Sequence, residues 1–151
     1  MKTLQNISEL LLLAGEEVAV SDWITISQEQ VNLFAQATGD HQWIHVDVDR
    51  ARTGPFGVPI AHGYLTLSLI SKFFESSMEL REPGMGVNYG LNKVRFPSPV
   101  PVGSRVRGHM KLLSCESLGN GGMQMAWLVT IEREGSDKPA CVAEALTRRY
   151  P

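Results

Sequence analysis

Residues 63–78 read GYLTLSLISKFFESSM, a run rich in Leu, Ile and Phe with no Gly or Pro after its first residue. Nothing inside the run interrupts helical hydrogen bonding, so we predict one mostly buried helix from about Gly63 to Met78. The chain just before it is broken by Gly54, Pro55, Gly57 and Pro59. Because a buried helix needs a cover, the fold depends on the elements around it.

Four β-rich runs follow this helix, separated by Pro, Gly, Asn and Asp: residues 87–96, 104–114, 123–133 and 140–149. Apolar and polar residues alternate well over residues 124–130, as in a strand with one buried face. We therefore predict four antiparallel strands. A long helix followed by such strands indicates an α+β domain in which the sheet covers the helix.

The chain upstream of the helix begins with weaker signals. Residues 22–26 alternate as a half-buried strand does, and Ser27 with Gln30 has the capping-box spacing that opens a helix. Gly39 is a natural stop for that helix. The sequence thus predicts a strand and an amphipathic helix ahead of the breaks.

Composition restricts the class of protein. A chain of 151 residues with 43% apolar and 20% charged residues fits a single globular domain over residues 1–151. A formal charge of −2 offers no excess of cations for nucleic acid. The apolar run at residues 10–14 is too short for a membrane span, so we expect no membrane partner and a cytoplasmic location. Cys115 and Cys141 lie in predicted strands and are interpreted as reduced packing residues.

An irregular link carries the densest cluster of polar groups. Asp47 can cap a short helix through Arg52, which leaves residues 40–46 as a link with Asp40 five positions before His45. On one continuous helix these side chains would point about 140° apart, whereas an irregular link lets them converge. Together they can hold one water and exchange protons with it. The plainer alternative is that Asp40 caps a turn and His45 is a satisfied loop histidine.

A metal site is the weaker interpretation of the same region. His41, His45 and Asp47 are possible zinc ligands, but no second HxxxH-type pair supports a metal site. We therefore predict no metal.

Gly63 stands at the start of the predicted helix, where backbone amides have no helical partner. It lets a substrate carbonyl approach an amide that can stabilise a developing enolate oxygen, although glycine also serves simply to begin a helix. Ser68 and Ser71 on that helix are either back-bonded serines or ligand contacts. No Gly-x-Ser-x-Gly motif is present, so a serine hydrolase is not expected.

Three segments resemble the MaoC-like proteins, the R-specific enoyl-CoA hydratases: residues 34–47 followed by Ala51, residues 60–68, and residues 90–100. The resemblance brackets roughly half the chain. It implies the hot-dog fold, a long central helix wrapped by an antiparallel sheet and usually paired as a homodimer. This implication agrees with the element order predicted from the residues.

The resemblance also implies roles. Asp40 and His45 match the catalytic pair that activates water for attack on a trans-2-enoyl thioester, giving the R-3-hydroxyacyl thioester of fatty acid metabolism. Gly63 matches the oxyanion amide, with Ser71 as a supporting contact. Coenzyme A would be part of the substrate, with no other cofactor, and Lys93 and Arg95 are possible contacts to its phosphates.

One departure from the family pattern is Gln42-Trp43, where many members carry Asn-Pro; it resembles the nodulation-protein-N-like branch. Because Trp is large and Pro fixes its own φ, this change leaves the acyl pocket and chain-length preference open. Three other functions remain open. They are dehydration of 3-hydroxyacyl chains on acyl carrier protein, thioester hydrolysis, and binding of an acyl thioester without turnover.

Overall fold

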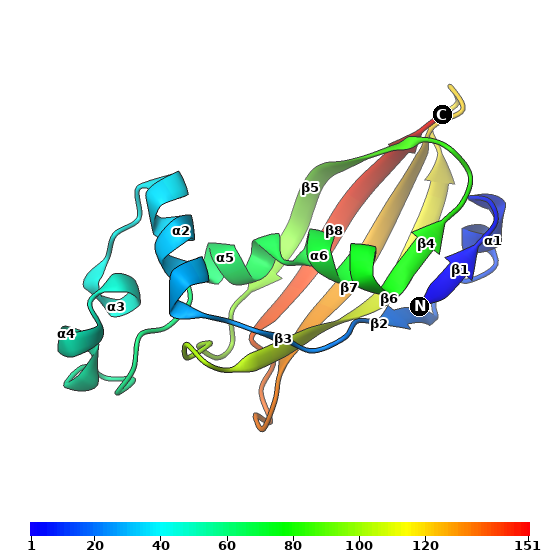
Figure 1. Ribbon diagram of the computed structural model, residues 1–151. Helices are drawn as coiled ribbons and strands as arrows, with labels where there is room; N and C mark the ends of the chain where they lie inside the picture. The colour runs from blue at the N-terminus through cyan, green and yellow to red at the C-terminus, as the bar shows by residue number, and fades with distance from the viewer.

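The central helix lies across one face of the sheet in a computed structural model that describes residues 1–151 (Figure 1). It consists of two pieces, α5 (Gly63–Ser68) and α6 (Ile70–Ser77), with the interruption at Leu69. Our prediction of a mostly buried helix is wrong for one face. Five of its residues are buried in the two pieces, Leu65, Thr66, Ile70, Phe73 and Ser77, whereas Tyr64, Ser68, Ser71, Lys72 and Glu75 are exposed.

The four predicted strands form the antiparallel core of one sheet. They are β5 (Met85–Arg95), β6 (Arg105–Ser117), β7 (Met123–Arg133) and β8 (Cys141–Tyr150). The sheet order is β2-β6-β7-β8-β5, and the short β2 (Glu17–Val20) and β3 (Ile24–Thr25) both pair with β6. The strand predicted over residues 22–26 is therefore reduced to two residues. The α+β prediction, a helix covered by an antiparallel sheet, is confirmed.

The N-terminal elements carried no clear signal in the sequence. β1 (Lys2–Leu4) pairs in parallel with β4 (Met78–Leu80), and α1 (Ser8–Leu11) follows β1. Met78, predicted as the helix end, already has extended backbone angles. Such short elements depend on tertiary contacts, here the burial of Leu4 and Leu10 in the core.

Three further helices lie beyond the end of the sheet (Figure 1). They are α2 (Gln28–Thr38), α3 (Trp43–Val46) and α4 (Val48–Arg52). Ser27 caps α2 by accepting a hydrogen bond from the Gln30 amide at 3.1 Å, and Gly39 ends it with a φ of 79°, as predicted. The link predicted over residues 40–46 is only partly irregular, because its second half forms the single turn of α3. No helix combines the length and apolar character that crossing a bilayer requires.

The central helix packs closely on the sheet at Gly108 in β6. A Cβ atom built there would lie 2.8 Å from the Phe73 ring, closer than two carbon atoms can approach. We expect Gly108→Ala to lower the free energy of unfolding by about 1–3 kcal/mol, because the Phe73 ring must leave its position. Urea unfolding measures this, with Gly86→Ala in β5 as the control, since no atom lies within 4 Å of the added methyl group there. Equal losses in both variants would contradict the packing argument.

Candidate active site

Asp40 is positioned by the end of α2. The left-handed Gly39 turns the chain away from the helix, and the Thr38 hydroxyl accepts the Asp40 amide hydrogen at 3.4 Å. The Asp40 carboxylate accepts the Gln42 amide hydrogen at 3.3 Å, which is the turn predicted as its plainer role. The side chain is nevertheless exposed and keeps its other oxygen free for a ligand.

His45 is held by two hydrogen bonds, one through its side chain and one through its own backbone. Its Nδ1 lies 2.6 Å from the Ile60 carbonyl oxygen, which can only accept, so Nδ1 carries the hydrogen. In the neutral ring, Nε2 then has a free lone pair. The side-chain amide of Gln28 also donates to the His45 backbone carbonyl at 2.8 Å. His45 is buried and oriented, as a proton acceptor needs to be.

A second histidine, His62, completes this cluster. Its ring stacks on that of His45 with 3.9 Å between centroids and 24° between planes. Its Nε2–H donates to the Asp40 carbonyl at 2.9 Å. Sequence reasoning gave His62 no role, and the only available signal was its place directly before Gly63.

The arrangement fits one shared water. The Asp40 carboxylate and one ring nitrogen from each of His45 and His62 lie within 4.8 Å of one another. Two hydrogen bonds of about 2.8 Å through one water reach up to roughly 5.6 Å, so a single water can contact two such groups at once. The convergence of Asp40 and His45 predicted from the sequence is therefore present in the structure.

The same three residues have the composition of a two-histidine, one-carboxylate metal site. Their geometry fits a metal poorly, because the in-plane lone pairs of two nearly parallel rings do not converge on one point. The metal site considered from the sequence is not assembled, since His41 is exposed and the Asp47 carboxylate accepts the Arg50 amide hydrogen at 3.0 Å as the cap of α4. That the protein uses no metal stays a prediction.

Burial lowers the pKa of His45 below its usual value of 6.5, and the nearby His62 lowers it further, against opposing contributions from the Ile60 carbonyl and Asp40. A group with a lowered pKa stays neutral to lower pH, so we expect the acidic limb of kcat/KM to have its midpoint below pH 6.5. Protonation also favours the unfolded chain, so stability falls as the pH drops from about 6.5 through the folded pKa. A pH profile of kcat/KM measures the limb. The exposed His41 supplies the control: His41→Gln should leave the limb in place, and a limb above pH 6.5 would contradict the burial argument.

The other predicted site residues lie farther apart. Gly63 follows His62 directly at the first position of α5. Ser71 is exposed, eight residues later, about 12 Å along the helix at roughly 1.5 Å per residue. Lys93 and Arg95 pair with Glu144 and Val142, which alternate with the buried alanines of β8. Both cations therefore project from the sheet face opposite α5 and α6, and one chain does not bring them to Asp40 and His45.

The departure at Gln42-Trp43 is accommodated at the edge of this region. Trp43 is half-buried against Gly54, where a Cβ atom would lie 3.0 Å from the indole, and the Arg50 guanidinium lies 4.2 Å above its ring. Trp43 is therefore a packing anchor. Gln42 is exposed at the N-cap of α3.

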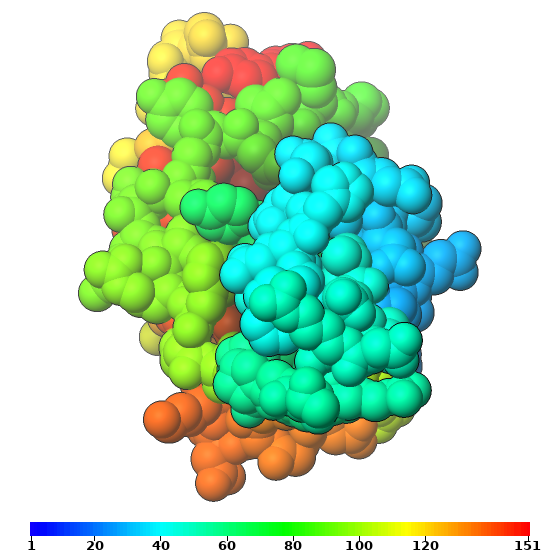
Figure 2. Space-filling model, turned by 90° about the vertical axis from the view of Figure 1, so that its left-hand side faces the viewer, coloured from blue at the N-terminus to red at the C-terminus, as the bar shows by residue number.

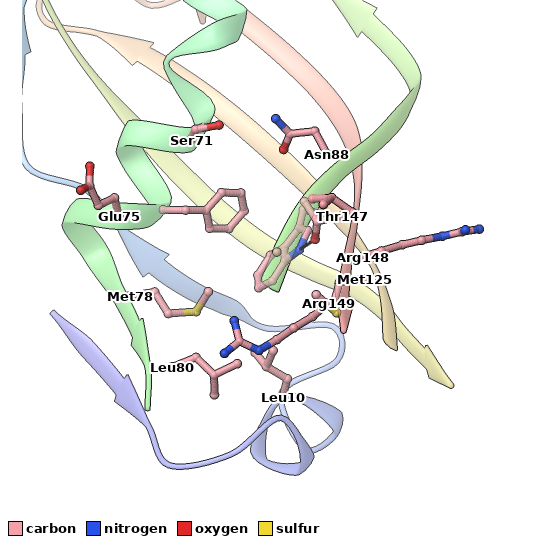
Figure 3. A pocket seen from close by; sticks show the side chains of 14 residues that line it. Leu10, Ser71, Glu75, Met78, Leu80, Asn88, Met125, Thr147, Arg148 and Arg149 are labelled. Carbon is pink, nitrogen blue, oxygen red and sulfur yellow. Dashed lines mark hydrogen bonds between the residues drawn. The ribbon is translucent and has the colours of Figure 1, made fainter. Parts of the chain in front are cut away.

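An apolar cavity of about 280 Å³ lies between α6 and the sheet (Figure 3). Ser71 and Asn88 stand at one end of it, and Leu10 and Leu80 at the other. A groove of about 450 Å³ between the central helix and β5 shares Ser71, Asn88 and Thr147 with this cavity. Figure 2 views the molecule from the site end, with the α2 to α4 segment in cyan and teal beside the light-green β5 region.

Comparison with known proteins gives matches along most of the chain. Residues 11–131 match the family described as MaoC like domain. A Mycobacterium tuberculosis protein named 3-hydroxyacyl-thioester dehydratase Z is 55% identical over 148 residues, covering 98% of both chains. Nodulation protein N of Rhizobium meliloti is 49% identical, covering 91% of this chain and 87% of that protein.

Hydratases appear among the more distant matches. An (R)-specific enoyl-CoA hydratase of Rhodospirillum rubrum is 37% identical over 82 residues, which is 54% of each chain. The unliganded structure of an R-hydratase from Pseudomonas aeruginosa superposes with a TM-score of 0.66 at 27% identity, covering 89% of this chain and 79% of that one. The fold is thus the hot-dog fold that the resemblance implied.

Proposed function

Because the chain belongs to the MaoC-like dehydratase family, we propose that it is a hydro-lyase that reversibly hydrates trans-2-enoyl-CoA to R-3-hydroxyacyl-CoA. The observation that carries the proposal is the pairing of an exposed carboxylate, Asp40, with a buried imidazole, His45, whose Nε2 is free to accept a proton. The R configuration and the coenzyme A carrier are supported by the names of the hydratases that the chain matches.

In the proposed hydration, Asp40 orients a water whose proton passes to Nε2 of His45. The water oxygen bonds to the β-carbon of the enoyl thioester, and the electron pair of the double bond moves toward the thioester oxygen. The α-carbon then takes up a proton from the dyad, so that one water is added in total. Dehydration follows the same steps in reverse. The reaction requires no cofactor besides the coenzyme A of the substrate.

The developing enolate oxygen needs a donor, and the Gly63 amide is the proposed one. It is the first amide of α5 and adjoins His62, so it lies next to the cluster. The apolar cavity beyond Ser71 is the proposed place for the acyl chain, because Phe74, Met78, Met125 and Trp127 line it. Ser71 would then contact the substrate at the mouth of that cavity.

We also propose that the protein is a homodimer paired along β5. This strand has a neighbour on one side only, and ten of its eleven residues are exposed, including Met85, Val87, Tyr89 and Leu91. An antiparallel partner β5 would satisfy the open edge and keep the cationic ends at Lys93 and Arg95 apart. It would also cover the exposed helix face that carries Ser68 and Ser71, beside the groove along β5.

The homodimer is tested by mass measurement in solution. We expect the native protein to sediment at twice its chain mass of 16.7 kDa. Leu91→Lys should weaken the association about 10-fold or more, because two cations would face each other near the strand centre, as charged edges do. Leu91→Val, which preserves the strand, is the matched control. A monomeric native protein would refute the pairing.

The reaction itself is tested with purified protein by the absorbance of the enoyl thioester. Crotonyl-CoA and a longer trans-2-enoyl-CoA are compared with the same acyl chains on acyl carrier protein. Formation of R-3-hydroxyacyl-CoA supports the proposal. Turnover of the carrier-protein thioester alone would show that acyl carrier protein, not coenzyme A, carries the substrate. Release of free coenzyme A would indicate thioester hydrolysis. Absence of turnover in folded protein would favour a protein that binds acyl thioesters without reaction.

A further inference from the structure

We propose that His62 is a positioning residue that fixes the separation and orientation of Asp40 and His45. This inference rests on the proposed hydratase function for its kinetic consequences. His62 contacts both members of the dyad, one through a hydrogen bond and the other through its ring face. It does not need to touch the reacting atoms to do so.

The hydrogen bond fixes the backbone of Asp40. The link after Gly39 is exposed, and within it Asp40 is otherwise tied only by the nearby Thr38 hydroxyl and the Gln42 amide. The His62 Nε2–H reaches the Asp40 carbonyl from a buried side chain that is 2% exposed. This contact therefore anchors the exposed member of the dyad to the start of the central helix.

The ring face fixes the orientation of His45. A hydrogen bond from Nδ1 to Ile60 restrains one edge of that imidazole but still allows the ring to tilt about the bond. His62 closes one face at 3.9 Å, and Phe34 supports His62 at 4.9 Å. The three rings in sequence thus restrain the tilt of the His45 imidazole.

The unpaired ring nitrogen of His62 indicates that this residue has a role besides packing. Nδ1 of His62 is buried and has no hydrogen-bond partner, which costs free energy that an apolar ring of similar size would avoid. Its other nitrogen is used only for the Asp40 carbonyl. The presence of a histidine at position 62, despite this cost, is explained if its hydrogen bond to the Asp40 carbonyl is needed to position the dyad.

Two variants separate the two contacts. His62→Phe retains a ring against His45 but removes the hydrogen bond to Asp40. His62→Gln retains an N–H donor but removes the ring and admits water beside His45. We expect His62→Phe to lower kcat about 10²-fold with little change in KM, the effect of misplacing a catalytic group by about 1 Å. We expect His62→Gln to retain more activity but to move the acidic limb of the pH profile toward higher pH.

A readout without turnover separates this inference from the function. The ring signals of His45, followed by NMR against pH, report its titration whether or not the chosen thioester is a substrate. The inference predicts a higher titration midpoint in His62→Gln than in the native protein. Unchanged titration in both variants, or native kcat in both, would overturn it. A rise in KM alone would also overturn it, because it would assign His62 to substrate binding.

Discussion

Replacing His45 with glutamine is expected to lower kcat about 10³-fold, within the usual range for loss of a general base. Glutamine has no atom that can take a proton from water at neutral pH, so the step that makes water nucleophilic is lost. Its side-chain amide can still donate to the Ile60 carbonyl and preserve the local backbone. Asp40→Asn should have a comparable effect, because the amide keeps an acceptor for the Gln42 amide but loses the charge that orients water. Initial rates with crotonyl-CoA measure both variants.

The control for this experiment is a measurement that both variants remain folded. Both substitutions lie outside the main hydrophobic cluster, so thermal unfolding should stay within a few degrees of the native protein. Asp47→Asn serves as the matched variant, since Asp47 caps α4 and touches no member of the dyad. Retention of more than about a tenth of native kcat in both dyad variants would rule out the assigned roles.

Replacing Gly63 with proline is expected to lower kcat about 10²-fold to 10³-fold, the usual effect of removing one oxyanion donor. Proline removes the amide hydrogen and is well tolerated at the first position of a helix. The preceding His62 has φ −60° and ψ 139°, backbone angles that a residue before proline favours. The substitution therefore removes the proposed donor with little change to the backbone.

Gly63→Ala is the matched control, because it keeps the amide hydrogen. Its added methyl group would lie 3.3 Å from the Phe96 ring, a tight contact that proline also makes. The ratio of kcat between the two variants therefore isolates the amide. Equal rates for both would show that the enolate oxygen is stabilised by another group.

Local patterns in the sequence predicted the elements whose stability is largely local or periodic. The β-rich run predicted over residues 123–133 coincides with β7, and Ser27, Gly39 and Asp47 marked helix ends through hydrogen bonds within a few residues. The five-residue spacing of Asp40 and His45 and the expected irregular link made a dyad possible, and the resemblance to the MaoC-like proteins assigned the pair its catalytic role. These inferences need no knowledge of distant contacts.

Long-range contacts explain what the sequence did not reveal. His62 joins the cluster through partners 17 and 22 positions away, a distance at which no local pattern operates. The sequence did not reveal that one face of α5 and α6 is exposed, because the serines on that face stand among many apolar residues. The outward direction of Lys93 and Arg95 follows from their register with β8, which depends on two bulges in the pairing with β5.

Because α3 and α4 lie beyond the end of the sheet, the segment that carries the proposed catalytic residues is distinct from the hydrophobic cluster that stabilises the fold. The main hydrophobic cluster of 22 residues contains none between Val31 and Ala61, and although Phe34 in α2 packs against it, α3 and α4 contribute no residue to it. Amide hydrogens of α3 and α4 should therefore exchange with solvent through local openings, while those of β7 wait for global unfolding. A segment of this kind can accumulate substitutions that alter substrate choice at little cost to folding.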